Sequence, residues 1–218
     1  MELRDALRST GAVRRFTDAA VDDATVAEIL DDARFAPSGG NRQPWRVAVV
    51  RDVSLRRRLA DAMRPVWDEY LAAGASGQVP YNVVSFDPPA EIEPGRPNPL
   101  LDSIADVPVV LVVAADLSQV AMMDAVLDRA PIAGGASVYP FCWNLLLAAR
   151  ARGLGGVMTT FLSRVEPLVR ADLALPRTYA LAATIFLGAP EHQPTKLRRA
   201  PVDSFATRDR FDGSPFGR

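Results

Sequence analysis

The feature that most constrains the fold is an almost unbroken apolar run at Val107–Ala115. More than half of the run is valine, a β-branched residue that favours strands, and no polar residue alternates with the apolar ones. A strand that is apolar on both faces has to be covered on both faces. The run is also far shorter than the roughly 20 residues that a membrane-spanning helix needs. The sequence therefore predicts a central strand with helices on either side.

The remaining segments predict one domain over residues 1–218. Residues 74–106 are Pro-rich with little apolar periodicity, and a segment of that kind is typically a variable insert, a lid or a binding loop. Residues 188–218 are Pro-rich and basic and predict an extended C-terminal arm. Helical spacing predicts helices at residues 1–9, 22–36, 54–73, 134–152 and 164–173, and further strands are expected at 46–50, 157–160 and 179–187.

Composition excludes several kinds of function. A net charge of −1 offers no basic surface for nucleic acid. With one cysteine and one histidine, the chain cannot build a disulfide framework or a structural zinc site, and we expect no bound metal. The N-terminus lacks a signal-peptide core, so we expect a cytoplasmic protein without a membrane partner. Of 25 cationic residues 24 are arginine, so a bound anion is expected to be held by guanidinium groups.

The most informative local motif is the Pro37–Trp45 run. Its two glycines let the backbone approach a flat ligand closely, because no Cβ stands in the way. Ser38, Asn41 and Gln43 supply hydrogen-bond donors and acceptors that suit a heteroaromatic edge or a polyol chain. Pro, Ser, Gly and Asn are also the residues of ordinary turns, so composition alone leaves a simple helix-to-strand connection open.

Three segments in this order, Arg14–Phe16, Pro37–Trp45 and Asn144–Gly155, resemble the flavin-dependent nitroreductase family, and the basic stretch Lys196–Pro201 completes the pattern. The resemblance spans residues 5–210. It implies an α+β sandwich with a central mixed sheet flanked by helices, in an intertwined homodimer with FMN at the interface. It further implies an enzyme that passes hydride from NAD(P)H through FMN to a nitroaromatic, quinone or related small-molecule acceptor in a ping-pong cycle.

The resemblance also assigns roles to residues. Arg14 matches the cation beside the flavin pyrimidine, where reduced flavin carries negative charge. Thr159 and Thr160 fall near the backbone donor that faces flavin N5, and with Arg14 they form the expected catalytic group. The cofactor-binding residues implied in this way are Thr10, Arg14, Arg15, Pro37, Ser38, Gly39, Asn41, Gln43, Arg198 and Arg199.

The sequence departs from the family where phosphate is usually bound. The family places two arginines and a serine there, and this chain has Thr10, Gly11 and Ala12. Arg15, Arg198 or Arg199 would then have to hold the phosphate. The departure leaves alternatives open: a deazaflavin-linked or flavin-consuming oxidoreductase on the same scaffold, or a non-catalytic protein that binds or sequesters flavin.

Overall fold

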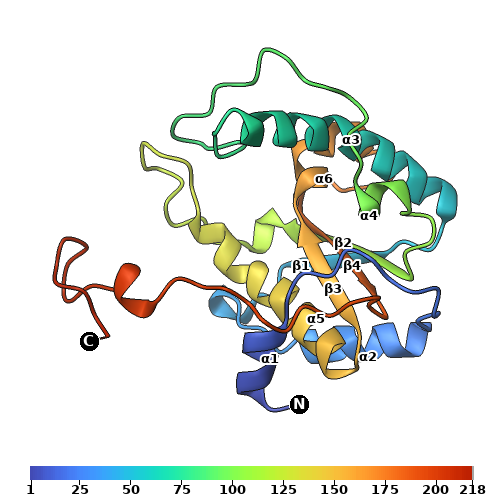
Figure 1. Ribbon diagram of the computed structural model, residues 1–218, viewed down its shortest axis with the longest axis horizontal. Coiled ribbons are helices and arrows are strands. Elements are labelled where there is room, and N and C mark those ends of the chain that lie inside the picture. Colours follow the sequence, from blue (N-terminus) through green and yellow to red (C-terminus); the bar gives the residue numbers. More distant parts are fainter. Residues whose placement is uncertain (218) are drawn as a thin grey trace.

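The computed structural model describes residues 1–217 and makes the apolar run an inner strand of a four-stranded sheet (Figure 1). The sheet order is β1-β2-β4-β3. The strands are β1 (Trp45–Val49), β2 (Val109–Asp116), β3 (Gly155–Thr159) and β4 (Tyr179–Gly188). The α-helices are α1 (Leu3–Ser9), α2 (Asp23–Ala33), α3 (Val53–Ala75), α4 (Pro99–Asp102), α5 (Tyr139–Ala151), α6 (Phe161–Arg164) and α7 (Glu166–Val169). This arrangement confirms the α+β class.

The prediction of a mixed sheet is wrong for these strands, because all three strand pairings are antiparallel. The single parallel pairing in residues 1–217 is an isolated bridge between Ala12 and Gly156, outside the named strand pairs. A strand that is apolar on both faces is typical of parallel sheets because helices usually cover both faces of such sheets. Here helices cover both faces of an antiparallel sheet, so burial alone does not fix strand direction.

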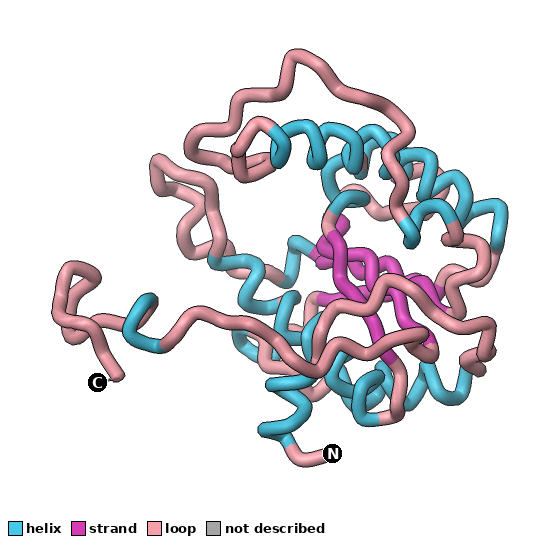
Figure 2. The backbone as a smooth tube through the Cα atoms, in the orientation of Figure 1, coloured by secondary structure: helices cyan, strands magenta, loops and turns pink. Residues whose placement is uncertain are grey.

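Strand β2 separates two hydrophobic cores. Alternate side chains of a strand point to opposite faces, and in β2 Val109, Leu111 and Val113 pack with α2 and α5. The intervening Val110 and Val112 pack with residues of α3, α4 and α6. The molecule is therefore a three-layer sandwich, in which α3 and α6 lie on one side of the sheet and α2 and α5 on the other (Figure 2).

Several helix ends differ from the sequence prediction for local reasons. Helix α3 begins after Asp52 rather than at Ser54, because the Asp52 carboxylate accepts a hydrogen bond from the Leu55 amide at 2.7 Å. The predicted helix at 164–173 is two short helices that end at 169. Pro167 lies in the first turn of α7, where its missing N–H and the restriction on the residue before it prevent continuation from α6.

The C-terminal arm first follows the body and then leaves it. Residues 189–191 pair with residues 15–17, and the chain beyond residue 200 stands away from the sandwich (Figures 1 and 2). Phe205, Phe211 and Phe216 on this arm are exposed. Within residues 1–217, none of the helices combines the length and the apolar character that crossing a bilayer requires.

The connection between β2 and α5 is organised by one carboxylate. The Ile132 amide, the Arg129 guanidinium and the Ala133 amide all donate to Asp124, and these hydrogen bonds lower its pKa to about 2. The charged carboxylate is therefore favoured in the folded loop. The outer face of this loop exposes Met123 and Val126.

We predict that this loop loosens as the pH falls from 3.8 to about 2, since the folded-state pKa of Asp124 lies below its ordinary value. The stabilisation is complete above that window and disappears below it. Asp124→Asn should have the same effect at neutral pH, seen as faster hydrogen exchange at the Ile132 and Ala133 amides. Asp128→Asn in the same exposed loop is the control, and equal exchange in both variants would contradict this role of Asp124.

Candidate functional site

The N-terminal segment at residues 10–17 runs between the edge strand β3 and the start of the C-terminal arm. On one side the Val13 amide donates to Gly156 O at 2.9 Å. On the other side the Thr17 amide donates to Ala189 O at 2.9 Å, and Figure 1 shows the blue and red segments side by side. Val13 is buried. This double attachment fixes the backbone on either side of Arg14.

Arg14 lines a cavity of about 540 Å³, which we call the Arg14 cavity. Its other walls are the end of β3 with Phe161, two aromatic residues of α3, and residues 98–100. The Arg14 guanidinium makes no hydrogen bond or ion pair with any residue in the described range 1–217. A cationic side chain that lines a cavity and has no ion-pair partner can bind a negatively charged group of a ligand. Arg14 also lines a neighbouring cavity of about 400 Å³, which it shares with Arg15 and with the carboxylates of Asp102, Asp106 and Glu191.

The end of β3 offers backbone donors to this cavity. Gly156 O accepts from Val13, so Gly156 faces the free edge of the sheet. Because successive residues of a strand direct their N–H groups to opposite edges, Thr159 faces β4, where it pairs with Thr184. The same alternation directs the N–H of Thr160 to the free edge. Of the two predicted threonines, Thr160 is thus the one whose backbone can donate into the cavity.

Thr159 also lines the Arg14 cavity. Its hydroxyl oxygen is buried and has no hydrogen-bond partner among residues 1–217. Leaving a buried hydroxyl without a partner costs about 1–3 kcal/mol. The structure therefore brings Arg14, Thr159 and Thr160, the expected catalytic group, together in one cavity, and their catalytic role stays a prediction.

The aromatic wall was not found from the sequence. Trp67 and Tyr70 on α3 stack with ring centroids 6.0 Å apart and planes within 10°. Phe161 meets Tyr70 edge to face at 5.7 Å. Tyr70 is 40% exposed, so the stack is open to an incoming ring. The available signal was the spacing of Trp67 and Tyr70, which puts both on one face of a helix.

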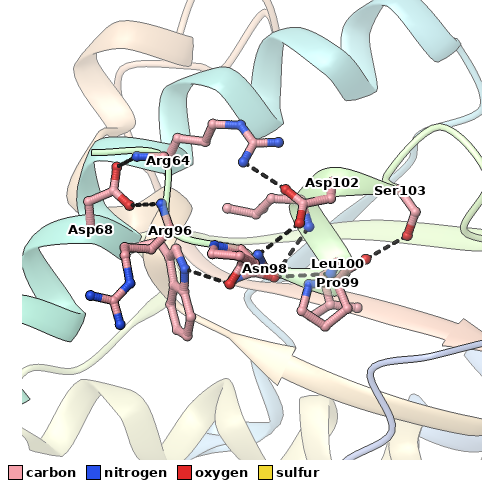
Figure 3. Close-up of polar contacts among 12 residues, drawn as sticks. Arg64, Asp68, Arg96, Asn98, Pro99, Leu100, Asp102 and Ser103 are labelled. Atoms are coloured by element: carbon pink, nitrogen blue, oxygen red, sulfur yellow. Dashed lines mark hydrogen bonds and ion pairs between the residues drawn. The ribbon is translucent and has the colours of Figure 1, made fainter. Parts of the chain in front are cut away.

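The fourth wall comes from the end of the insert at residues 74–106. Asn98 is the N-cap of α4, and its side-chain oxygen accepts a hydrogen bond from the Leu100 amide at 3.0 Å. Asp102 accepts from the Asn98 amide at 2.9 Å and from Arg64 of α3 at 2.8 Å (Figure 3). The Arg64 guanidinium is the largest influence that lowers the pKa of Asp102. The insert is therefore not a loose loop where it reaches the cavity.

Residues 37–43 of the Pro37–Trp45 run form a largely exposed loop with unusual backbone angles. Asn41 and Gln43 have φ of 53° and 49°, in the left-handed region that costs about 1–2 kcal/mol for residues other than glycine. Two hydrogen bonds hold the loop in this conformation. The Gln43 amide donates to Ser38 Oγ at 3.0 Å, and the Gly39 amide donates to Ser137 Oγ at 3.0 Å. Persistent strain in an exposed loop is typical of a binding site.

This loop lines neither of the two cavities that Arg14 lines. Its position is fixed at the far end by Trp45, which stacks on Phe141 of α5 with centroids 4.8 Å apart. Pro37, Ser38, Gly39, Asn41 and Gln43 thus form a group of their own within one chain. Their cofactor role remains a prediction.

In the segment Thr10–Ala12, which departs from the family pattern, there is no room for a larger side chain at Gly11. The Thr10 hydroxyl donates to Ala6 O at 2.6 Å, so its proton is committed within α1. A Cβ on Gly11 would lie 2.8 Å from Pro194 Cβ and 2.9 Å from Leu197 Cδ2, both on the arm. Further along the arm, Arg198 and Arg199 are exposed, and Arg199 Nη1 donates to Arg198 O at 2.7 Å.

A model of the Nitroreductase family matches residues 7–189. Similar curated proteins include a "NADH dehydrogenase" of Thermus thermophilus, 29% identical over 230 residues (93% of this chain, 94% of the relative). A "5,6-dimethylbenzimidazole synthase" of Rhodospirillum rubrum is 30% identical over 198 residues (86% and 82%). A protein from Desulfovibrio desulfuricans, described as a nitroreductase and solved with FMN, shares the fold with a TM-score of 0.69 at 23% identity (97% and 98%). This chain belongs to the nitroreductase family.

Proposed function

We propose that this protein is a flavin-dependent oxidoreductase that passes hydride from NAD(P)H through FMN to a flat small-molecule acceptor, such as a nitroaromatic or a quinone. The observation that carries the proposal is the unpartnered Arg14 guanidinium in one cavity with the free edge of β3. Family membership supports it, as do a relative named as an NADH dehydrogenase and a similar fold solved with FMN.

The residues present fit a flavin. An isoalloxazine ring needs an aromatic or apolar bed, a cation near the pyrimidine edge and a hydrogen-bond donor at N5. The cavity offers the Trp67–Tyr70 stack, Arg14 and the Thr160 amide in those roles. The buried, unpartnered Thr159 hydroxyl would gain a partner from a polar ligand. The histidine-poor composition is no obstacle, because hydride transfer at the ring needs no side-chain acid or base.

Bound flavin would supply the chemistry of accepting and donating hydride. The protein would supply binding, orientation and electrostatics. Arg14 would place positive charge where negative charge develops on reduction, and the Thr160 amide would hold the ring by a hydrogen bond. The aromatic wall would exclude water from the reacting face, which strengthens both interactions.

We infer that a second copy of the chain completes the site. The strained Pro37–Gln43 loop has the chemistry of a flavin-binding loop, yet it lines no cavity with Arg14 in its own chain. In a homodimer, the Pro37–Gln43 loop of one subunit could lie against the Arg14 cavity of the other subunit, so that both would contact the same flavin.

Absorbance of the purified protein with and without added FMN tests the proposal. We expect a yellow complex that bleaches anaerobically with NADH or NADPH and recovers its colour with a quinone or a nitroaromatic. A yellow protein that neither bleaches nor turns over acceptors would instead indicate flavin sequestration. A protein that binds no FMN would contradict the proposal and favour a different ligand, such as a deazaflavin.

The flavin-consuming alternative is favoured by one relative, the protein named 5,6-dimethylbenzimidazole synthase. It is distinguished by the product. Incubation with reduced FMN and oxygen should yield no 5,6-dimethylbenzimidazole by chromatography if the proposed function holds. Accumulation of that compound with loss of flavin would replace the proposal.

We predict that Arg199→Ala mainly weakens flavin retention. With the Thr10 proton committed and Gly11 covered by the arm, the phosphate charge has to be met by arginines such as those of the arm. Loss of one charge-assisted hydrogen bond raises a dissociation constant by roughly tenfold to over a hundredfold. FMN titration by fluorescence measures this, with Arg57→Ala on the exposed face of α3 as the control. Unchanged FMN affinity would remove Arg199 from the site and implicate Arg15 or Arg198.

A further inference from the structure

Asp68 of α3 is a buried carboxylate outside the groups considered so far. It is 6% exposed. Its two oxygens accept hydrogen bonds from successive backbone amides at the end of the insert, from Gly95 at 2.9 Å and from Arg96 at 3.0 Å (Figure 3). No cationic side chain in the described part of the chain forms an ion pair with it, and the Arg96 guanidinium pairs with Glu93 instead. The Asp68 carboxylate is therefore held by backbone N–H groups and not by an ion pair with a cationic side chain.

The residue next to Asp68 on α3 continues this attachment. The Trp67 indole N–H donates to Pro97 O at 3.2 Å. Three consecutive residues of the insert, 95–97, are thus tied to two consecutive residues of α3. The residues that follow immediately, 98–100, form the insert's wall of the Arg14 cavity. Trp67 itself lines the same cavity and stacks on Tyr70.

We propose that Asp68 is a positioning residue that sets the distance between the insert wall at residues 98–100 and the aromatic wall of the Arg14 cavity, and so the affinity for a flat acceptor. This inference rests on the proposed function. Asp68 reaches the cavity only through the backbone it holds, because it does not line the cavity itself. It belongs instead to the opposite side of the insert, facing a separate hollow beside α3.

A carboxylate is suited to this task for a chemical reason. Both of its oxygens accept hydrogen bonds, so it can hold two adjacent amides at once. An asparagine of the same shape has one accepting oxygen and a donating NH₂ group, so one of the two amides would lose its partner. Asp68→Asn is therefore a nearly isosteric change that releases one anchor of the wall without altering the cavity lining.

We expect Asp68→Asn to raise the KM for a quinone acceptor by about tenfold, the effect of one lost charge-assisted hydrogen bond. The FMN dissociation constant and the rate of flavin reduction by NAD(P)H should change much less than the acceptor KM, because Arg14, the Thr160 amide and the arm arginines proposed to bind flavin are unaltered. Hydrogen exchange of a peptide covering residues 95–100 should become faster. Glu93→Gln is the matched control, because it removes a charge from the same segment but only breaks an exposed ion pair.

Asp68→Glu provides a second test if Asp68→Asn does not fold, since it keeps both accepting oxygens but displaces them by one methylene from the amides of Gly95 and Arg96. It should also raise the acceptor KM with flavin affinity retained. An unchanged acceptor KM in a flavin-loaded variant, or an equal change in flavin affinity and acceptor KM, would overturn the positioning role. A wild-type protein that binds no FMN would overturn the proposed function, and this inference with it.

Discussion

Arg14→Ala is expected to slow the reduction of bound flavin by about 100-fold, the usual cost of removing one preorganised group at developing charge. Flavin affinity should fall much less. The reason is that oxidised flavin is neutral at the ring, so the guanidinium stabilises the reduced state more than the oxidised one. The Arg14 side chain has no competing partner in residues 1–217, so its whole interaction is available to a ligand.

Anaerobic stopped-flow mixing of the flavin-loaded variant with NAD(P)H measures this rate directly. Arg14→Lys is the matched control, because it keeps the positive charge and loses the planar fork, and it should recover part of the rate. A lower redox potential of the bound flavin should accompany the slower reduction in Arg14→Ala. Equal reduction rates in the fully loaded variant and wild type would contradict a role of Arg14 at the ring.

The fold follows from the sequence where a pattern has a single physical solution. The Val107–Ala115 run could only be a covered strand, and it is β2. Strand direction was not predictable, because antiparallel and parallel sheets covered by helices demand the same apolar run. Helix α3 begins at Val53, one residue before the expected start at 54, because the Asp52 carboxylate caps it.

The candidate site was predicted only in part, because a local motif does not reveal what lies opposite it. The sequence singles out Arg14 and Thr160, and the structure places both in one cavity, while their roles stay a prediction. The aromatic wall lies in the middle of the long helix α3, where Trp67 and Tyr70 fit the apolar face of an ordinary amphipathic helix and give no sign of a binding role. The role of Asp68 could not be predicted from the sequence, because its partners are the backbone amides of residues 27 and 28 positions further along the chain.

The exposed surface of the single chain bears on the proposed homodimer. Apolar side chains are exposed on the arm and on the loop between β2 and α5, where Met123 and Val126 are 82% and 92% exposed. Where such exposed side chains form one patch, they are typical of an interface. Helix α1 likewise has no buried residue and exposes Leu3 and Leu7. These surfaces fit the intertwined homodimer that the family resemblance implies.

The largest effect is expected from mixing two impaired variants, each of which lacks one group of the proposed site. If each site combines Arg14 of one subunit with Asn41 of the other, a heterodimer of Arg14→Ala and Asn41→Asp chains contains one wholly native site. Random reassembly then restores about a quarter of wild-type sites, since half of the dimers are mixed and each has one good site of two. Asn41→Asp suits the test because aspartate also tolerates the left-handed φ of 53°.

The outcome is read as flavin turnover after the two chains are unfolded and refolded together, with light scattering to confirm a mass near 47 kDa, twice the 23.6 kDa of one chain. Mixing Arg14→Ala with Trp67→Ala is the control, because both residues line the same cavity of one chain and no native site can form. Recovery in the first mixture alone would establish a site shared between subunits. Equal failure of both mixtures, or a 23.6 kDa species that retains flavin, would place the Pro37–Gln43 loop outside the site and confine the chemistry to the Arg14 cavity of a single chain.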